Sequence, residues 1–430
     1  MVLIWSAGAL LVLLVSYWAP VFRGFGAMLA IGCAIGGAIR GVQAYRRMVV
    51  DKRLEHFGKE FITLDALKVL ARKAAAAKQY WLGRGFPWSD IEATKLHTLM
   101  SMGVVRTIGR VAQHHEGAYW VHGLAPETDL FSEVANLVGH TLIVGSTRVG
   151  KTRLFDVLIA QAIFRGETVI IIDPKGDHGL AQNARAVCEA TGEGDRFVYF
   201  HPAHPDRSAC IDPLRNWNRK TELASRVAAL IPSETGADPF TAFGWKVLND
   251  ITNGMIATGN RPNLVQLRRY VEGGPESLLL QALKIHFTNN VRDWESRVAS
   301  YVRRYKDRTL QAYVAFYQEV AINEAQSVDL DGLISTFEHN RDHFQKMIAS
   351  LIPILSMLTS DPLQELLSPD FDPGHERLVT DMSKVIRGNK VVYIGLDSLA
   401  DSTVGSAIGS IMLADLAAVA GDRYNYGIHT

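Results

Sequence analysis

The stretch "HTLIVGSTRVGKTRLF", from His140 to Phe155, constrains the fold of this chain more than any other. Its apolar run "TLIV" is typical of a short buried strand, and a glycine-containing loop follows. Residues 145–152 match the pattern G-x-x-x-x-G-K-[ST] at every defined position. The apolar positions after the loop fall on one face of a 3.6-residue helix: Leu154, Phe155, Leu158, Ile159, Ala162 and Ile163. A strand, such a loop and a helix together predict a nucleoside-triphosphate site in an α/β domain.

Each residue type in this loop has a chemical reason to be there. Glycines let successive backbone amides turn inward around phosphate oxygens, and the free N–H groups of the following helix add to that cradle. Lys151 is expected to reach the β and γ phosphates, and the Thr152 hydroxyl is expected to ligate Mg²⁺. The predicted cofactors are therefore ATP and Mg²⁺. The predicted nucleotide-binding residues are Gly145, Ser146, Thr147, Arg148, Val149, Gly150, Lys151 and Thr152. For the Arg148 side chain, a solvent-facing position remains the alternative.

Hydrolysis also needs an aspartate at the end of an apolar strand to steady Mg²⁺, usually with a second group that orients water. Two aspartates end apolar runs, Asp173 after "VIII" and Asp397 after "VVYIGL". Neither is followed by a second acid. Asp173 and the nearby Lys175 are secondary candidates for the site, with a capped turn as the alternative role. The catalytic residues stay unassigned from the residues alone.

Strand and helix patterns alternate after the loop and then stop. "ETVIIIDPKGD" and "DRFVYFHP" are apolar throughout their strand portions, which favours a parallel sheet covered on both faces. Residues 258–360 show helical patterns only, and a strand returns in "NKVVYIGLD". We therefore expect an α/β nucleotide-binding domain in two parts, residues 131–257 and 361–430, interrupted by an all-α insert.

The N-terminus is apolar and free of acidic residues up to Asp51. Val2 to Phe22 is 21 residues without a charge, close to the length that spans a bilayer. After Arg23, Gly24 to Ile39 adds 16 uncharged residues rich in the small side chains that let membrane helices approach. A cleaved signal peptide needs a basic segment first, and only Met1 precedes the run. We expect a transmembrane hairpin over residues 1–47, with a buried soluble hairpin as the alternative.

Orientation follows from the charges beyond the hairpin. From Arg40 to Gln79 there are ten Lys or Arg against four Asp or Glu, and basic segments stay in the cytoplasm. Both termini and the bulk of the chain are therefore expected in the cytoplasm, next to ATP. Residues 48–130 form the juxtamembrane region: its first part has a helical pattern that can meet anionic headgroups, and residues 83–130 look like short strands and turns.

A basic and aromatic run from Val291 to Tyr317 is a candidate DNA contact. Arginines and lysines bind phosphates, and interleaved aromatic rings stack on bases. The alternative is a solvated helix whose aromatic side chains belong to the core. The three cysteines and fourteen histidines have no metal-ligand spacing, and the near balance of 45 basic and 44 acidic residues identifies no partner.

The order of these features resembles one family. An N-terminal hairpin, "LGRGFPW", "GSTRVGKT", "IIDPKGD", "ACIDPL" and a helical insert are similar to the type IV coupling proteins, specifically the TraD-like branch of conjugative plasmids and integrative conjugative elements. The resemblance implies a RecA-like ATPase that forms a homo-hexamer at the bacterial inner membrane. It also implies delivery of a relaxase–DNA complex to a type IV secretion channel, with contacts to DNA, channel components and lipid.

The family also has a later strand ending in Asp-Glu, the metal-binding and catalytic acid pair. The resemblance places that pair beyond Thr430, so the chain is expected to be the front portion of a longer protein. Three functions therefore stay open from the sequence. They are an ATP-driven conjugative coupling protein, a non-hydrolysing ATP-binding docking module for secretion substrates, and an unrelated membrane-anchored DNA-segregation ATPase.

Overall fold

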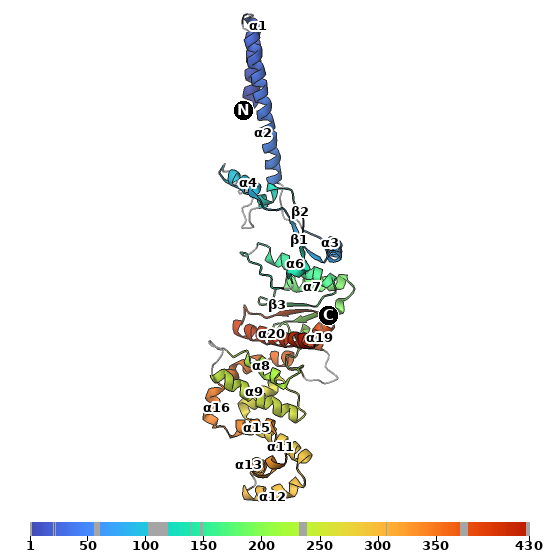
Figure 1. The fold of residues 1–430 in the computed structure, drawn as a ribbon, viewed down its shortest axis with the longest axis vertical. Helices are drawn as coiled ribbons and strands as arrows, with labels where there is room; N and C mark the ends of the chain where they lie inside the picture. Colours follow the sequence, from blue (N-terminus) through green and yellow to red (C-terminus); the bar gives the residue numbers. More distant parts are fainter. Residues whose placement is uncertain are drawn as a thin grey trace. The chain divides into compact units, whose positions relative to one another are not determined.

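The computed structural model describes residues 2–19, 21, 23–55, 61–101, 119–137, 139–146, 149–231, 239–306, 308–369 and 377–426. The chain forms two compact units, Met1–Gln161 and Ala162–Thr430. Figure 1 shows the helices and strands of both units in sequence colours.

The first unit begins with two long helices, α1 (Val2–Trp18) and α2 (Arg23–Glu55). They pack antiparallel: a Cβ added to Gly36 would lie 3.1 Å from the ring of Trp5, and one added to Gly8 would lie 3.9 Å from Cys33 Sγ. The absence of side chains at these glycines lets the two backbones approach. Most other apolar side chains of the pair are exposed. The predicted two-helix hairpin is therefore present; Pro20, in the connection between the two helices, lies outside the described residues.

Two helices in the described part of the chain are long and apolar enough to cross a membrane. One is the stretch Gly24–Arg46 of α2, of which only 11% is buried. The other is α20 (Ser402–Asn425), 39% buried, with Ile408, Ile411 and Met412 fully buried in the core of the second unit. The length and composition of α2 thus fit a membrane span, whereas α20 packs as a core helix of its unit.

The remainder of the first unit surrounds a small antiparallel hairpin, in which β1 (Gln79–Gly85) pairs with β2 (Thr128–Glu133). The other elements are α3 (Leu64–Ala76), α4 (Asp90–Ser101), the 3₁₀ helices η2 (Tyr119–Leu124) and η3 (Val134–Leu137), and the first residues of α6 (Lys151–Phe164). Helix α4 was not expected from the sequence. Its start is marked by Ser89, whose hydroxyl accepts the Ile91 amide and bonds Glu92, a Ser-x-x-Glu signal that the weak periodicity of the segment concealed.

A three-stranded parallel sheet forms the α/β part of the second unit. β7 (Val391–Gly395) lies between β3 (Val169–Asp173) and β4 (Phe197–Phe200), in the order β3-β7-β4. Every residue of β7 is buried, as expected of a central strand with both neighbours in place. Helix α7 (His178–Ala190) follows β3. A second parallel pair joins β5 (Cys210–Ile211) to β6 (Val379–Thr380). The parallel sheet predicted from apolar runs is confirmed.

The expected strand "TLIV" is wrong in this structure. None of the described residues 139–146 is in a strand, and Leu142 and Val144 are 87% and 82% exposed. A parallel strand is held by backbone hydrogen bonds to its neighbours. An apolar composition without such pairing is not enough to form a strand.

Between β5 and β6 the described residues contain helices and no strand. They are α8 (Lys220–Ala228), α9 (Pro239–Ala257), α10 (Leu264–Gly273), α11 (Glu276–Asn290), α12 (Trp294–Arg304), α13 (Thr309–Phe316), a π-helix (Tyr317–Ala321), α14 (Ile322–Glu324), α15 (Val328–Glu338), α16 (Arg341–Met347), α17 (Leu351–Leu358) and α18 (Leu363–Leu367). Helices α19 (Met382–Arg387) and α20 follow β6 and β7. One hydrophobic core runs through the sheet, these helices and α20.

Candidate nucleotide site

The predicted phosphate loop ends where α6 begins, so Lys151 and Thr152 are the first two residues of that helix. The Lys151 ammonium donates to the carbonyl oxygens of Gly145 and Ser146, both at 2.6 Å. Gly150 has a φ of +94°, a conformation that glycine adopts without strain. The lysine therefore lies folded over its own loop, with its charge at the amino-terminal end of the helix.

This arrangement suits a phosphate group. A Cβ at Gly145 would lie 2.6 Å from Val149 and 3.6 Å from the Lys151 side chain, so only glycine leaves this space open. Val149, Gly150 and Thr152 are exposed, and the first N–H groups of α6 lack partners within the helix. The residues present thus fit nucleotide phosphates. Thr147 and Arg148 lie outside the described residues, and the role of the whole set stays a prediction.

Asp173, the secondary candidate for Mg²⁺, has its carboxylate occupied by protein donors. Oδ1 accepts the Lys175 amide at 3.0 Å. Oδ2 accepts the Asp177 amide at 2.5 Å and the Tyr393 hydroxyl at 2.8 Å. Burial, and then the hydrogen bond to Asp173, raises the pKa of Tyr393, which therefore remains a donor. The carboxylate closes the turn after β3, which is the capped-turn role. The Lys175 side chain is exposed at the same turn.

A histidine that sequence reasoning did not single out covers the carboxyl end of the sheet. His201 follows β4, is 5% exposed, and occupies the space that a Cβ on Gly176 or Gly395 would need. Its Nδ1 accepts the Ala203 amide at 3.2 Å. Burial lowers the pKa of the imidazole, with the nearby Asp397 opposing that effect. Both aspartates expected at strand ends thus act electrostatically on one buried ring. The signal available was the pair of glycines, one in "DPKG" and one in "YIGLD".

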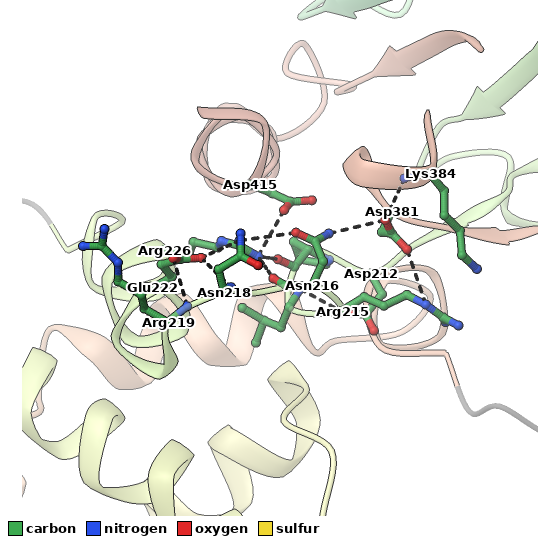
Figure 2. A network of polar contacts seen from close by, with 12 residues as sticks. Asp212, Arg215, Asn216, Asn218, Arg219, Glu222, Arg226, Asp381, Lys384 and Asp415 are labelled. Atoms are coloured by element: carbon green, nitrogen blue, oxygen red, sulfur yellow. Dashed lines mark hydrogen bonds and ion pairs between the residues drawn. The ribbon is translucent and has the colours of Figure 1, made fainter. Parts of the chain in front are cut away.

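A second feature that the sequence did not reveal is a buried polar network between α8, α19 and α20 (Figure 2). Arg226 of α8 is its centre: Nη1 donates to the carbonyls of Pro213 and Asn216 at 2.9 and 2.7 Å, and lies 3.1 Å from Asp415 Oδ1. Asp415 belongs to α20 and is 0% exposed. Segments before and after the helical region are therefore joined through one guanidinium.

Two more buried carboxylates complete this network. Asp212, in the "ACIDPL" stretch, accepts the Leu214 amide at 3.0 Å. Asp381 caps α19 by accepting the Lys384 amide at 2.9 Å and lies 3.4 Å from Arg215 Nε. Burial raises the pKa of Asp212 to about 6 and that of Asp415 to about 7. Among the described residues, no group of three or more His, Cys, Asp or Glu has metal-binding geometry.

The basic run from Val291 to Tyr317 folds as α12, α13 and the start of the π-helix. Its aromatic side chains pack inward: Trp294 and Tyr301 lie against the hydrophobic core. Two of its arginines are paired, Arg297 with Glu324 and Arg304 with Glu319. These two rings thus contribute to the core, which is the alternative role, and the exposed cations remain candidates for phosphate contact.

The comparisons with known proteins give one match. Residues 126–273 match the family model of the central domain of the helicase HerA. The match covers less than half of the chain and includes the phosphate loop, β3 and β4. Comparison with curated proteins and with solved structures gave no match. This part of the chain is thus similar to a HerA-type P-loop ATPase domain, a type related to FtsK-like and TraD-like proteins. This domain type indicates nucleotide binding and DNA translocation.

Proposed function

We propose that this chain is the nucleotide-binding part of a membrane-anchored conjugative coupling protein of the TraD-like branch, which delivers relaxase-bound DNA to a type IV secretion channel. The proposed fold is a RecA-like domain with an all-α insert. The N-terminal hairpin crosses the bacterial inner membrane, and the bulk of the chain lies in the cytoplasm. The working assembly is a homo-hexamer that contacts DNA, lipid and channel components.

The observation that carries this proposal is the conjunction of the phosphate loop with the N-terminal apolar hairpin. A HerA-type domain alone fits many DNA translocases. The exposed, apolar stretch Gly24–Arg46 of α2 adds a candidate membrane anchor, which a motor at a membrane channel needs. The helices between β5 and β6 add a separate region for substrate contact, in the order that the coupling-protein resemblance implies.

The proposed mechanism assigns binding roles to this chain's own residues. Lys151 would exchange its two carbonyl contacts for the β and γ phosphates, and the amides of the loop and of the first turn of α6 would hold the remaining oxygens. Thr152, exposed at the second position of α6, would ligate Mg²⁺ through its hydroxyl. Mg²⁺ bound there supplies neutralisation of the phosphate charge. The acid that orients water is not assigned to a residue of this chain.

A second candidate function is a docking module that binds ATP without hydrolysing it. The observation in its favour is the engagement of Asp173, whose two carboxylate oxygens accept three protein donors. Asp397 has a φ of +53° in the turn after β7, and no second acid is adjacent in the sequence. The unrelated DNA-segregation ATPase remains a third candidate, which a pull-down with relaxase separates from the coupling role.

The first experiment measures nucleotide binding by the full chain in detergent, using a fluorescent ATP analogue with Mg²⁺. We expect Lys151→Ala to weaken binding at least tenfold, because a phosphate-binding charge is lost. Lys284→Ala, an exposed lysine on α11, is the matched control and should bind as the unchanged chain does. Equal binding by the two variants would refute the phosphate role of the loop. ATP turnover by the unchanged chain would exclude the docking module.

A further inference from the structure

One side chain joins the helix of the phosphate loop to the β1–β2 hairpin. Gln161, on α6, accepts the Trp81 amide through Oε1 at 2.8 Å and donates from Nε2 to the Trp81 carbonyl at 2.8 Å. Gln161 is 1% exposed and Trp81 is 7% exposed. The glutamine amide thus pairs with the backbone of β1 much as a residue of a neighbouring strand would.

The position of this contact explains why a glutamine is needed. Trp81 lies beside the irregularity of the hairpin, where the register shifts between Trp81 and Gly83. A glutamine amide offers both a donor and an acceptor, whereas an aliphatic side chain would leave two buried backbone groups unsatisfied. The Trp81 indole is held separately, by a 3.1 Å hydrogen bond from Nε1 to Asp129. The backbone of Trp81 therefore bonds to α6, whereas its indole ring bonds to Asp129 of β2.

Helix α6 connects this contact directly to the phosphate loop. Lys151 is its first residue and Gln161 lies ten residues later, a separation of about 15 Å along a continuous helix. Gln161 also donates to the Val157 carbonyl at 3.1 Å, which fixes its side chain on the helix. The Lys151 bonds to Gly145 and Ser146 are those that a bound phosphate would replace, so binding reorganises the end of α6 opposite to Gln161.

We propose that Gln161 is a positioning residue that couples nucleotide binding at the phosphate loop to the β1–β2 hairpin. The inference rests on the proposed nucleotide function of residues 145–152. A change at the first turn of α6 moves Gln161, and β1 follows because both backbone groups of Trp81 are bonded to that side chain. The coupling is reciprocal: an event that displaces the hairpin, whose strand β1 follows the N-terminal helices in the chain, changes nucleotide affinity.

Hydrogen exchange of the Trp81 amide measures this coupling directly, because the acceptor of that amide is Gln161. The full chain in detergent is compared with and without Mg²⁺ and ATPγS, and nucleotide binding is measured on the same samples. We expect bound nucleotide to order α6 and to slow exchange at Trp81 about fivefold, the effect of strengthening one hydrogen bond. In Gln161→Leu the exchange should be fast and independent of nucleotide, although nucleotide still binds.

Two control variants distinguish coupling through Gln161 from a general loss of stability. Asp129→Ala removes the other hydrogen bond of Trp81 and should retain the nucleotide response. Gln161→Glu keeps an acceptor for the Trp81 amide but loses the donor to the Trp81 carbonyl. It should therefore show a smaller change in Trp81 exchange on nucleotide binding, and it replaces Gln161→Leu as the test if that variant does not fold. An unchanged response in the Gln161 variants, or no response in an unchanged chain that binds nucleotide, would overturn the coupling. Absence of nucleotide binding by the unchanged chain would overturn the proposed function itself.

Discussion

The buried carboxyl of Asp415 makes the stability of the second unit depend on pH. Burial raises its pKa from 3.8 to about 7, although Arg226 opposes that rise. A raised pKa means that the folded state prefers the protonated acid, whereas the unfolded chain ionises it near pH 4. This contribution to stability is therefore complete below about pH 4 and is lost as pH rises through 7. The perturbation that tests it is Asp415→Asn, which keeps the shape and cannot ionise.

The size of the effect follows from the two pKa values. A difference of about three pH units corresponds to roughly 4 kcal/mol in the free energy of unfolding, of which about 2.5 kcal/mol is lost between pH 5 and pH 8. For a unit of this size, each kcal/mol shifts the melting temperature by about 2–4 °C. Relative to the unchanged chain, Asp415→Asn should therefore gain about 5–10 °C between pH 5 and pH 8. The pKa of Asp212 is raised to about 6, so this carboxyl adds a smaller pH dependence of the melting temperature that both proteins share.

The assay is thermal unfolding of the full chain in detergent, followed by intrinsic fluorescence at pH 5, 6, 7 and 8. Hydrogen exchange of α8 and α20 peptides assigns the change to the network of Figure 2. Asp422→Asn, on the same helix and outside this network, is the matched control and should follow the unchanged chain at every pH. A constant difference between Asp415→Asn and the unchanged chain over this range would show that the carboxyl is already ionised in the fold, and the reasoning would fail.

Three further outcomes are expected. Under the proposed coupling function, Lys151→Ala should abolish DNA transfer in a mating assay and leave membrane insertion unchanged, because the N-terminal helical hairpin does not take part in phosphate binding; normal transfer would contradict the motor. Removal of residues 1–47 should move the chain from the membrane pellet to the soluble fraction, since the apolar span is lost; retention in the pellet would show that the anchor lies elsewhere. Gly395→Ala should destabilise the second unit by about 1–3 kcal/mol through overpacking, because its Cβ would meet the His201 ring, and thermal unfolding measures this. Gly421→Ala, with nothing within 4 Å, should be neutral or slightly stabilising, and an equal loss in both variants would argue against the His201 contact.

Much of the fold was predictable because it depends on local pattern. The runs "VIIID", "FVYF" and "VVYIG" became β3, β4 and β7, since a buried parallel strand must be apolar on both faces. The same rule failed for "TLIV", which has the composition of a strand and no pairing partner in this structure. Within α6, the apolar pattern predicted Phe155 on the buried face, yet Phe155 is 47% exposed. Gln161, a polar residue, is buried together with Ala160 and Ile163.

The candidate site was likewise predictable only in part. The phosphate loop was visible in the sequence because backbone amides, a lysine and a threonine act within eight consecutive residues. For Asp173 the sequence left two roles open, a Mg²⁺ ligand or a capped turn, because the Tyr393 hydroxyl that its carboxylate accepts comes from far along the chain. The burial of His201 and of Asp415 was also not predictable from the sequence, since the residues around them come from several elements.

By itself, the sequence of this protein determined the phosphate loop, the apolar hairpin, the parallel strands and the helical region between β5 and β6. These depend on residue type and on spacing along the chain. Only the tertiary structure decided which polar groups are buried together: Gln161 with Trp81, Arg226 with Asp415, and Asp173 with Tyr393. A buried donor or acceptor must find its partner wherever the fold brings one close, and that partner is set by packing in space rather than by position in the sequence.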